Sequence, residues 1–431
     1  MREWPLALQT FWQQHGIDPA LYDTAGPHVP RRYVRLNPLT NTTLADVQAE
    51  LSSSSAAEVT LEQVPATWCH VQPFYGLPGD CPVGALEAHK QGRVHAMDVA
   101  SALAVQTLQV RPDDHVLDLC CAPGNKMALI ASLLQVHDPT LGRIGTGTVT
   151  GVDISKHRLQ TTKSAVLGRL KCLNRCRLFL ADGTRFAEPP SSLPTAYLHQ
   201  IHPALAAPAA SVAAAATHDA QSVATATTRD KPFYVSRLLK GRPTAQLLYD
   251  RVLVDAECTH DASMVHMLKQ VSGQHAHREQ DWQRFLSASL SKAHERPLLQ
   301  GKLLANGFRL LIPGGLLVYS TCSMTKEQNE DVVHAFLSAH SADAVLLSIA
   351  EKPHMPLSRY RPCADAVCDD LMQEILLKSV RLGGPSLPDP ALVDATDSTT
   401  EAVLVDTTDS TTKALWTSGL FIALIQKKAS C

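Results

Sequence analysis

Short apolar runs that end in an aspartate constrain the fold of this chain more than any other feature. Runs at 115–119, 148–152 and 177–180 read as strands, and each lies at or just before an acid: Asp118, Asp153 and Asp182. From about residue 96 onward, such runs alternate with longer amphipathic segments, as in a doubly wound α/β sheet. Ligands of open α/β sheets bind beyond the carboxyl ends of the strands. The three acids therefore predict a ligand site along one edge of a sheet.

Further runs complete this predicted sheet. Residues 251–254, 316–319 and 420–425 also read as strands, the second of them after a turn at Pro313-Gly314-Gly315. A helix is expected from about 126 to 134, and Ser155 is a plausible N-cap for the next helix. The pattern predicts an α/β, Rossmann-like fold with a smaller N-terminal module.

Two domains are expected, with 1–95 as a loop-rich N-terminal module and 96–427 as the larger domain. The module contains the basic stretch 30–37, Pro-Arg-Arg-Tyr-Val-Arg-Leu-Asn. This stretch is either an exposed strand with solvated arginines or a contact for phosphate groups. Residues 191–230 and 385–415 read as flexible inserts, because they are polar or rich in Ala, Ser, Thr and Pro. The second insert carries a near-repeat at 394–413.

Composition limits the class of protein. Lys plus Arg (39) nearly balance Asp plus Glu (41), so any contact with nucleic acid must come from local patches. The eleven cysteines form no Cys-x-x-Cys pair, which favours reduced thiols inside a cell. We expect no membrane span, because no apolar run reaches 18 residues. The N-terminus does not resemble a secretory signal, so the cytoplasm or nucleus is expected and the mitochondrion stays open.

The loop after the first strand suits a sulfonium cofactor. It turns through Pro123-Gly124 into a helix, whose N-terminal N–H groups favour a ligand carboxylate. S-adenosylmethionine carries such a carboxylate, Asp153 is placed for ribose hydroxyls, and Asp182 is placed for the adenine amino group. The predicted cofactor-binding residues are Cys120, Cys121, Ala122, Pro123, Gly124, Asn125, Lys126, Asp153, Asp182 and Asp255.

Two cysteines follow predicted strands, Cys258 in Val254-Asp-Ala-Glu-Cys-Thr259 and Cys322 in Tyr319-Ser-Thr-Cys-Ser323. Carbon 5 of cytosine is a poor nucleophile until a thiolate adds to carbon 6 and makes the adduct enamine-like. A buried acid such as Asp255 can stabilise the adduct through ring N3. After methylation, carbon 5 must lose its proton before the thiol leaves, and a second thiol or base helps that step.

With these motifs the sequence resembles the Sun/Nop family of RNA cytosine-5 methyltransferases. The resemblance runs from Pro30 to Lys427, both inserts excluded. Its motifs are Arg-Tyr-Val-Arg-Leu-Asn at 32–37, Gly-Arg-Val-His-Ala-Met-Asp-Val-Ala-Ser at 92–101, Cys-Cys-Ala-Pro-Gly-Asn-Lys at 120–126, Leu-Ala-Asn-Gly at 304–307, Tyr-Ser-Thr-Cys-Ser at 319–323 and Gln-Asn-Glu-Asp-Val-Val at 328–333.

The resemblance implies roles for single residues. Cys322 matches the nucleophile, Cys258 the cysteine of product release, and Asp255 and Lys126 residues that contact the target base. Asp153 and Asp182 match the ribose and adenine contacts of the cofactor. The implied partner is an RNA substrate, tRNA or rRNA, and we expect neither a membrane nor an obligate protein partner.

Two positions depart from the family pattern. Glu257 stands where Pro is usual, and its charge is expected to raise the pKa of Cys258. Asn125 stands where a second Gly is usual, a milder change because Asn tolerates a left-handed backbone.

Other functions are open at this level. Cys258, His260, Asp261 and His266 could form a metal site, but a capping Asp261 and surface histidines are preferred, so no metal is expected. A DNA cytosine methyltransferase would use the cysteine after the fourth strand as nucleophile, whereas here the stronger context surrounds Cys322. The second-ranked function is an RNA-binding scaffold that keeps the fold while Glu257 blocks turnover.

Overall fold

The computed structural model describes most of the chain, and the rest is left aside. The described residues are 6–17, 31–54, 59–64, 69, 71–138, 143–194, 197, 230–242, 244, 246–263, 295–349, 380–382 and 420–429. The predicted insert at 385–415 lies outside these residues, as does most of the insert at 191–230. Among the described helices, none is long and apolar enough to cross a membrane.

A large, mostly parallel sheet organises the described part of the chain. Its strands are β5 (His115–Asp118), β8 (Thr148–Asp153), β9 (Cys176–Leu180), β10 (Pro232–Val235), β11 (Tyr249–Asp255), β12 (Leu311–Thr321), β13 (Ala344–Leu347), β14 (Val380–Leu382) and β15 (Leu420–Lys427). Their order is β10-β9-β8-β5-β11-β12-β15-β13, and β14 also pairs with β15. The five neighbouring strands β9, β8, β5, β11 and β12 are parallel to one another, whereas β10, β13, β14 and β15 pair antiparallel.

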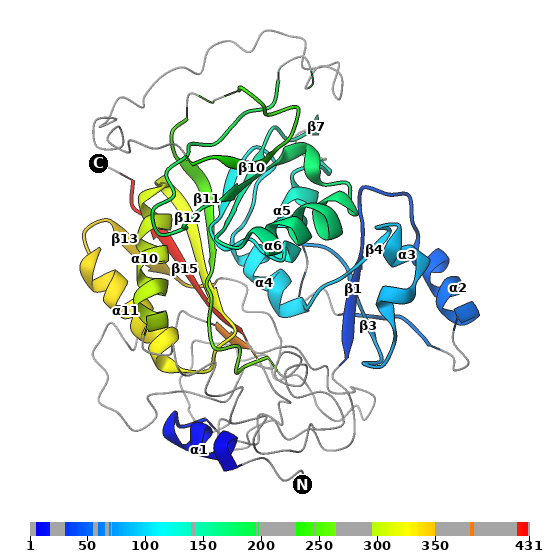
Figure 1. Cartoon of the computed structure of the whole chain (residues 1–431), viewed down its shortest axis with the longest axis horizontal. Coiled ribbons are helices and arrows are strands. Elements are labelled where there is room, and N and C mark those ends of the chain that lie inside the picture. Colours follow the sequence, from blue (N-terminus) through cyan, green and yellow to red (C-terminus); the bar gives the residue numbers. More distant parts are fainter. Residues whose placement is uncertain are drawn as a thin grey trace, which may run out of the picture.

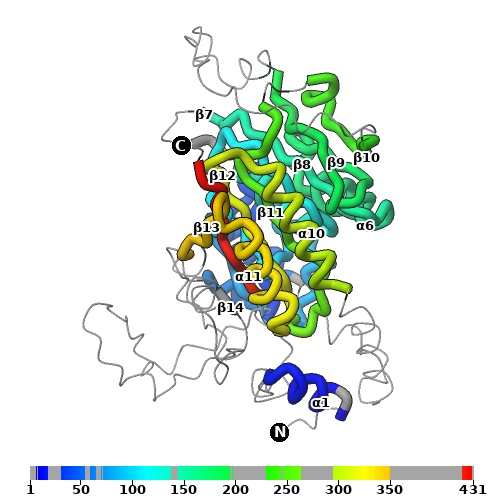
Figure 2. Tube along the Cα trace, turned by 90° about the vertical axis from the view of Figure 1, so that its left-hand side faces the viewer, coloured from blue at the N-terminus to red at the C-terminus, as the bar shows by residue number. Residues whose placement is uncertain are grey.

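Helices cover both faces of this sheet (Figure 1). One face carries α4 (Val99–Thr107), α5 (Asn125–Leu133), α6 (Lys156–Thr161) and the π-helical segment η3 (Thr162–Gly168); the other carries α10 (Glu295–Arg309) and α11 (Glu330–Ala339). Figure 2 shows α10 and α11 lying along the strands. Side chains alternate between the faces of a strand. Val116 and Leu117, adjacent on β5, accordingly belong to two different hydrophobic cores.

Most of the predicted elements are confirmed. The runs at 115–119, 148–152, 177–180, 251–254 and 420–425 form β5, β8, β9, β11 and β15, and the helix predicted at 126–134 is α5. The Ser155 side chain caps α6 by accepting from the Arg158 N–H at 3.4 Å.

The strand predicted at 316–319 is present, but its predicted first residue is wrong. β12 begins at Leu311 and runs through the Pro-Gly-Gly segment, which we had predicted to be a turn before the strand. Tyr249 pairs with Leu311 and Arg251 with Leu316, so the extra residues form a bulge inside the strand. Gly314, at φ +79°, supplies the backbone conformation that the bulge requires.

A second, antiparallel sheet forms the N-terminal module. Its order is β2-β3-β1-β4, and the elements around it are short. They are β1 (Arg32–Leu36), α2 (Leu44–Ser54), β2 (Glu62–Gln63), β3 (Phe74–Leu77), η2 (Val83–Ala85), α3 (Glu87–Lys90) and β4 (Val94–Ala96). Elsewhere lie α1 (Leu6–Gln14), β6 (His137–Asp138), β7 (Arg143–Ile144), η4 (Leu173–Arg175) and η6 (Lys326–Gln328) (Figure 1). The predicted boundary at 95/96 falls inside β4, which pairs with β1.

The arginines of the basic stretch have different environments. Arg32 is exposed and donates from Nε to the Gly79 carbonyl at 2.7 Å. Arg35 is fully buried and donates from Nη1 to Gln72 Oε1 at 2.9 Å. Burial lowers the pKa of Arg35 to about 10. Neither predicted reading, solvated arginine or phosphate contact, holds for Arg35, because its strand face packs against the rest of the molecule.

The N-terminal module packs directly on the segment after η3. Asn37 is buried and donates from Nδ2 to the carbonyls of Gly92 at 2.8 Å and Leu170 at 3.0 Å. Gly92, at φ +72°, lies so close to Arg169 that an added Cβ would be 1.9 Å from the Arg169 carbonyl oxygen. These contacts hold the ends of β1 and β4 against residues 169–170, the segment that directly follows η3.

Candidate active site

The loop between β5 and α5 presents the free N–H groups of a helix start. Gly124 is the N-cap residue at φ +106°, and no side chain caps the helix there. A Cβ on Gly124 would lie 2.8 Å from Thr162 Cγ2, so the turn packs tightly on η3. The Cys121 N–H donates to β8 at 2.9 Å, and the Ala122 carbonyl accepts from the Arg158 guanidinium. The result is a fixed loop whose N–H groups suit an anionic ligand group.

The structure brings the three strand-end acids to one edge. They follow β5, β8 and β9, which are adjacent and parallel. Asp153 is 5% exposed and accepts from the Ser155 N–H at 2.8 Å. Asp182 accepts from the Thr184 N–H at 2.9 Å. Each of these carboxylates is oriented by the turn after its own strand, the behaviour expected of Asp in an Asx-turn.

Burial sets the protonation of the loop itself. Asp118 is 1% exposed, and burial together with the charge of Asp255 raises the pKa of Asp118 to about 7. Burial likewise raises the pKa values of the Cys120 and Cys121 thiols well above the ordinary value. Raised pKa values leave these two cysteines as unreactive thiols.

A partly buried ion pair links the loop to the end of β11. Lys126 Nζ lies 2.6 Å from Asp255 Oδ2 and 3.3 Å from Ser101 Oγ. Ser320 Oγ donates to the other Asp255 oxygen at 2.7 Å. Burial disfavours the charged form of Lys126, but the Asp255 carboxylate outweighs it, so the pKa of Lys126 is raised. Lys126 therefore stays a cation and Asp255 is held in place by two donors.

The two cysteines meet beside this ion pair. β11 and β12 are parallel neighbours, and Asp255 pairs with Ser320, two residues before Cys322. The Cys258 and Cys322 sulfurs are 3.2 Å apart, and the Cys322 N–H points at Cys258 Sγ at 3.3 Å. Cys258 is 1% exposed, whereas Cys322 is partly exposed. Cys322 is therefore the sulfur that a large substrate can reach.

His260 completes the thiol site, so its predicted place among surface histidines is wrong. Its Nδ1 lies 2.8 Å from Cys322 Sγ and 3.6 Å from Cys258 Sγ. Burial opposes ionisation of Cys258, but the hydrogen bond from Cys322 and the charge of His260 lower the pKa of Cys258 to about 5. The hydrogen bond to Cys258 in turn raises the pKa of Cys322. The two sulfurs thus share one negative charge, which is also why the charge of Cys258 raises the pKa of His260.

The spacing of these donors suits hydrogen bonds better than a metal ion. The three donor atoms lie within 4.8 Å of one another. Ligand atoms around tetrahedral zinc are about 3.5 Å apart or more, from the usual bond lengths. The contact of 2.8 Å between His260 and Cys322 is shorter than that. His266, which the metal alternative required, lies outside the described residues.

The prediction that Asp261 is a surface cap is wrong. Asp261 joins the loop after β11, which carries Cys258, to the loop after β12, which carries Cys322. It is 2% exposed, and it accepts from Ser323 Oγ at 2.9 Å and from the Met324 N–H at 2.7 Å. Gln328 supports the same contact, because its Nε2 donates to Thr259 Oγ1 at 2.9 Å and to Ser323 Oγ at 3.1 Å. The loop after β11 is therefore fixed to the loop after β12.

The predicted effect of Glu257 on Cys258 is wrong. The Glu257 side chain is 54% exposed and lies 3.9 Å from Arg296 Nη2. The pKa of Cys258 is lowered and not raised, because His260 and Cys322 are its close neighbours. Adjacent residues of an extended segment point to opposite sides, which sends Glu257 away from the thiols.

Asn125, the second departure from the family pattern, has a specific partner. Its Oδ1 lies 3.1 Å from His95 Nε2, and the other ring nitrogen of His95 faces Arg169 Nη2 at 3.0 Å. Because Arg169 can only donate, His95 accepts at Nδ1 and donates from Nε2 to Asn125. The first residue of α5 is thereby tied to β4 of the small sheet.

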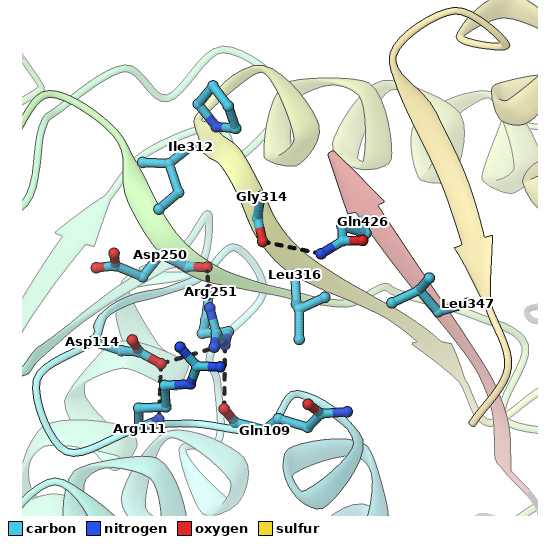
Figure 3. A pocket seen from close by; sticks show the side chains of 11 residues that line it. Gln109, Arg111, Asp114, Asp250, Arg251, Ile312, Gly314, Leu316, Leu347 and Gln426 are labelled. Carbon is cyan, nitrogen blue, oxygen red and sulfur yellow. Dashed lines mark hydrogen bonds and ion pairs between the residues drawn. The ribbon is translucent and has the colours of Figure 1, made fainter. Parts of the chain in front are cut away.

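A pocket of about 310 Å³ lies at the opposite edge of the sheet (Figure 3). It is lined where β5, β11 and β12 begin, and Arg251 Nε there pairs with Asp114 Oδ2 at 3.3 Å. Ligands of open α/β sheets bind at the other, carboxyl edge. Arg251 and Asp114 also pair with each other there, so this pocket is separate from the site that the acids and thiols form.

Sequence reasoning missed His260, Asp261, Gln328 and His95 as parts of the site. A Cys-x-His spacing was visible in Cys258-Thr259-His260, but it did not reveal which direction the imidazole faces. His95 and Asn125 are 30 residues apart, so their contact follows only from how the two sheets pack.

Comparisons with known proteins identify a family for this chain. The family described as 16S rRNA methyltransferase RsmB/F matches residues 105–201 and 195–358. The mitochondrial tRNA (cytosine(34)-C(5))-methyltransferase of Danio rerio is 27% identical over 257 residues, 59% of this chain and 49% of that protein. The 5-cytosine rRNA methyltransferase NSUN4 of Bos taurus is 29% identical over 242 residues, 56% of this chain and 43% of that protein. The chain thus spans less than half the length of these two relatives.

Solved structures show the same fold. NSun6 from Pyrococcus horikoshii with SFG superimposes with a TM-score of 0.55 at 14% identity, covering 99% of both chains. A methyltransferase homolog protein from Pyrococcus horikoshii gives a TM-score of 0.52 at 19% identity, covering 97% of this chain and 94% of that one. The predicted Rossmann-like fold class is confirmed. Because the family match covers more than half of the residues, the predicted resemblance is also confirmed: the chain belongs to the RsmB/F family of methyltransferases.

Proposed function

We propose that this chain methylates carbon 5 of cytosine in RNA, with S-adenosylmethionine as the methyl donor. The observation that carries the proposal is the pair of sulfurs 3.2 Å apart at the carboxyl edge of the sheet. Family membership and the names of relatives that act on tRNA or rRNA support it. Because the chain matches only part of those relatives, its RNA substrate is proposed by class alone.

The residues at the sheet edge fit the cofactor. The uncapped N–H groups of α5 can bind the methionine carboxylate, and Asp153 can accept from ribose hydroxyls. Asp182, at the end of the next strand, is assigned to the adenine amino group. When bound, S-adenosylmethionine supplies an electrophilic methyl group. The loop from Cys120 to Asn125 and the pair Lys126–Asp255 would line its site.

The chemistry follows from the arrangement of the thiols. The Cys322 thiolate attacks carbon 6, and the activated carbon 5 takes the methyl group. Asp255 and Lys126, paired at 2.6 Å, are assigned to the target base, where they can stabilise charge on the ring. Cys258 then assists removal of the carbon-5 proton, so that the carbon–sulfur bond breaks and Cys322 leaves.

The observation that favoured the alternative function, an RNA-binding scaffold without turnover, no longer supports it. It rested on a charge at Glu257 that would disturb Cys258, whereas that side chain is exposed and lies near Arg296. No other contact in the described part of the site favours it.

Purified protein and methyl-labelled S-adenosylmethionine test the proposal. Small and ribosomal RNA from cells lacking the gene should gain label in 5-methylcytosine, located by bisulfite sequencing. Cys322→Ala should abolish transfer, because without the adduct carbon 5 stays unactivated. Cys258→Ala should accumulate a covalent protein–RNA adduct, seen as a slow band on a denaturing gel.

Cys81→Ala is the matched control, because Cys81 is a buried free thiol in the core of the small sheet, which is separate from the two cores of the large sheet. It should transfer methyl groups as the unmodified protein does. Full activity of Cys322→Ala would overturn the proposal. An adduct trapped in Cys322→Ala but not in Cys258→Ala would exchange the two roles.

A further inference from the structure

We propose that His260 is a catalytic imidazole of the thiol site: it balances the single thiolate shared by Cys258 and Cys322 and passes the carbon-5 proton from Cys258 to solvent. The steps on cytosine rest on the proposed function. The charge balance between His260 and the two sulfurs rests on this site alone and can be tested without RNA.

Geometry is the first argument. Nδ1 of His260 contacts both sulfurs, at 2.8 Å to Cys322 and 3.6 Å to Cys258. The imidazole is therefore in contact with the sulfur that attacks and with the sulfur that assists release. An imidazole at hydrogen-bond distance from a thiol is the arrangement that activates catalytic cysteines.

The backbone of His260 is the second argument. Its φ of +57° lies in the left-handed region, which is unfavourable for a residue with a Cβ. The turn is nevertheless fixed, because the Ala262 N–H donates to the Cys322 carbonyl at 3.1 Å and the Ser263 N–H to the His260 carbonyl at 3.0 Å. Strain held by its surroundings concentrates at functional sites. A Gly or Asn would satisfy this backbone with less strain, so the imidazole itself is what the position supplies.

The charges around the imidazole favour its protonated form. Cys258 contributes most, burial opposes, and Asp255 at the end of β11 and Asp261 in the next turn add to the effect of Cys258, so the pKa of His260 is raised. The charge of Lys126 lowers the pKa of Cys322, but the hydrogen bond to Cys258, burial and the charge of Cys258 raise it more. In the proposed resting state, an imidazolium therefore lies beside one thiolate.

A balanced cycle follows from this state. In the resting site the shared proton lies on Cys322, because Cys258 has the lower pKa of the two. This proton first passes to Cys258 across the 3.2 Å contact between the sulfurs. The Cys322 thiolate then adds to carbon 6, and the ring electrons take the methyl group at carbon 5. Once Cys322 is bonded to carbon, the negative charge beside His260 is gone, and the imidazolium releases its proton to solvent. Neutral His260 next takes the proton of Cys258, whose thiolate removes the proton of carbon 5.

Breakage of the carbon–sulfur bond then closes the cycle. The electron pair of the broken carbon–hydrogen bond restores the double bond between carbons 5 and 6, and Cys322 leaves as a thiolate. The site returns to one thiolate, one thiol and an imidazolium. One proton has gone to solvent, which balances the positive charge that the sulfonium loses.

Alkylation by iodoacetamide without RNA or cofactor tests the charge balance. In the unmodified protein, the summed alkylation of Cys258 and Cys322, read by peptide mass spectrometry, should change less than about twofold between pH 6 and 8. In His260→Asn, where Asn tolerates the left-handed backbone, the summed alkylation should rise about tenfold per pH unit. The reason is that thiols with an ordinary pKa near 8.5 are mostly protonated in this range, so the thiolate fraction grows with pH. An unchanged profile in this variant would overturn the inference, whether or not the protein methylates RNA.

Chemical rescue tests the proton transfer. His260→Gly removes the imidazole and relieves the backbone, and it should slow multiple turnover and accumulate the RNA adduct. Added imidazole should restore its turnover, and the same imidazole should leave Cys258→Ala unchanged. His334→Asn, on α11, is the control and should turn over normally. Failure of imidazole to rescue a folded His260→Gly would reject the proton-transfer role, while methyl transfer itself could still stand.

Discussion

At the scale of single residues, burial decides which groups of the site carry charge. Lys126 keeps its charge because Asp255 lies at 2.6 Å, and the two sulfurs keep one charge between them because His260 balances it. No cation in the described part of the chain contacts Asp118 directly, and burial, together with the charge of Asp255, raises its pKa to about 7. Its Oδ1 accepts only from the Cys120 N–H, at 3.3 Å, among the contacts of the described residues.

Asp118→Asn should make the protein more stable at pH 8 than the unmodified chain. The folded Asp118 has a pKa of about 7 and the unfolded one about 3.9, so the folded state binds more protons between these values. Stability is therefore lost as pH rises from about 4 to 7, by at most about 4 kcal/mol. Asn keeps an oxygen for Cys120 and cannot ionise. Urea unfolding without cofactor at pH 5 and 8 measures this, and parallel curves for both proteins would contradict the assigned pKa.

At the scale of elements, periodicity and strand ends predicted where the site lies. The strands ending at Asp118, Asp153 and Asp255 were recognisable because buried parallel strands are apolar and end abruptly in polar residues. The bulge in β12 was not, because Pro-Gly-Gly suits a turn equally well. The π-helical η3 and the inward direction of His260 depend on packing between segments far apart in sequence, which a local pattern does not contain.

The start of α5 gives an element-scale prediction through His95. Burial, Arg35 and Arg169 lower the pKa of His95 to about 3, whereas its unfolded value is about 6.5. The unfolded state binds the proton first, so stability is lost as pH falls from about 6.5 toward 3. Between pH 7 and 5, the free energy of unfolding of His95→Gln should therefore fall by about 2 kcal/mol less than that of the unmodified protein. Free energies of unfolding from urea titrations at both pH values measure the difference.

Asn125→Gly separates the contact from the titration. It removes the acceptor of the His95 N–H but leaves the buried imidazole, so it should lower stability by a similar amount at pH 7 and 5. If His95→Gln instead follows the same pH dependence as Asn125→Gly, His95 is not the group that titrates.

At the scale of the whole molecule, the small N-terminal sheet is fixed to the large sheet beside the loop between β5 and α5. Asn37 bridges Gly92 and Leu170, and His95 connects Arg169 to the first residue of α5. The sequence suggested a separate module because the pattern changes near residue 95. It could not reveal this junction, since every contact joins residues that are distant along the chain.

Gly92→Ala is the sharpest test of that junction. A Cβ at residue 92 would approach the Arg169 carbonyl oxygen to 1.9 Å, and φ is +72°. Gly241→Ala is the matched control, because φ is +68° there and no atom lies within 4 Å of the added Cβ. The control should lose only the left-handed backbone term, about 1–2 kcal/mol. Gly92→Ala must also displace the segment after η3, so its loss of unfolding free energy should reach at least about 3 kcal/mol. Equal losses in urea titrations of the two variants would mean that the sheets do not need this close approach.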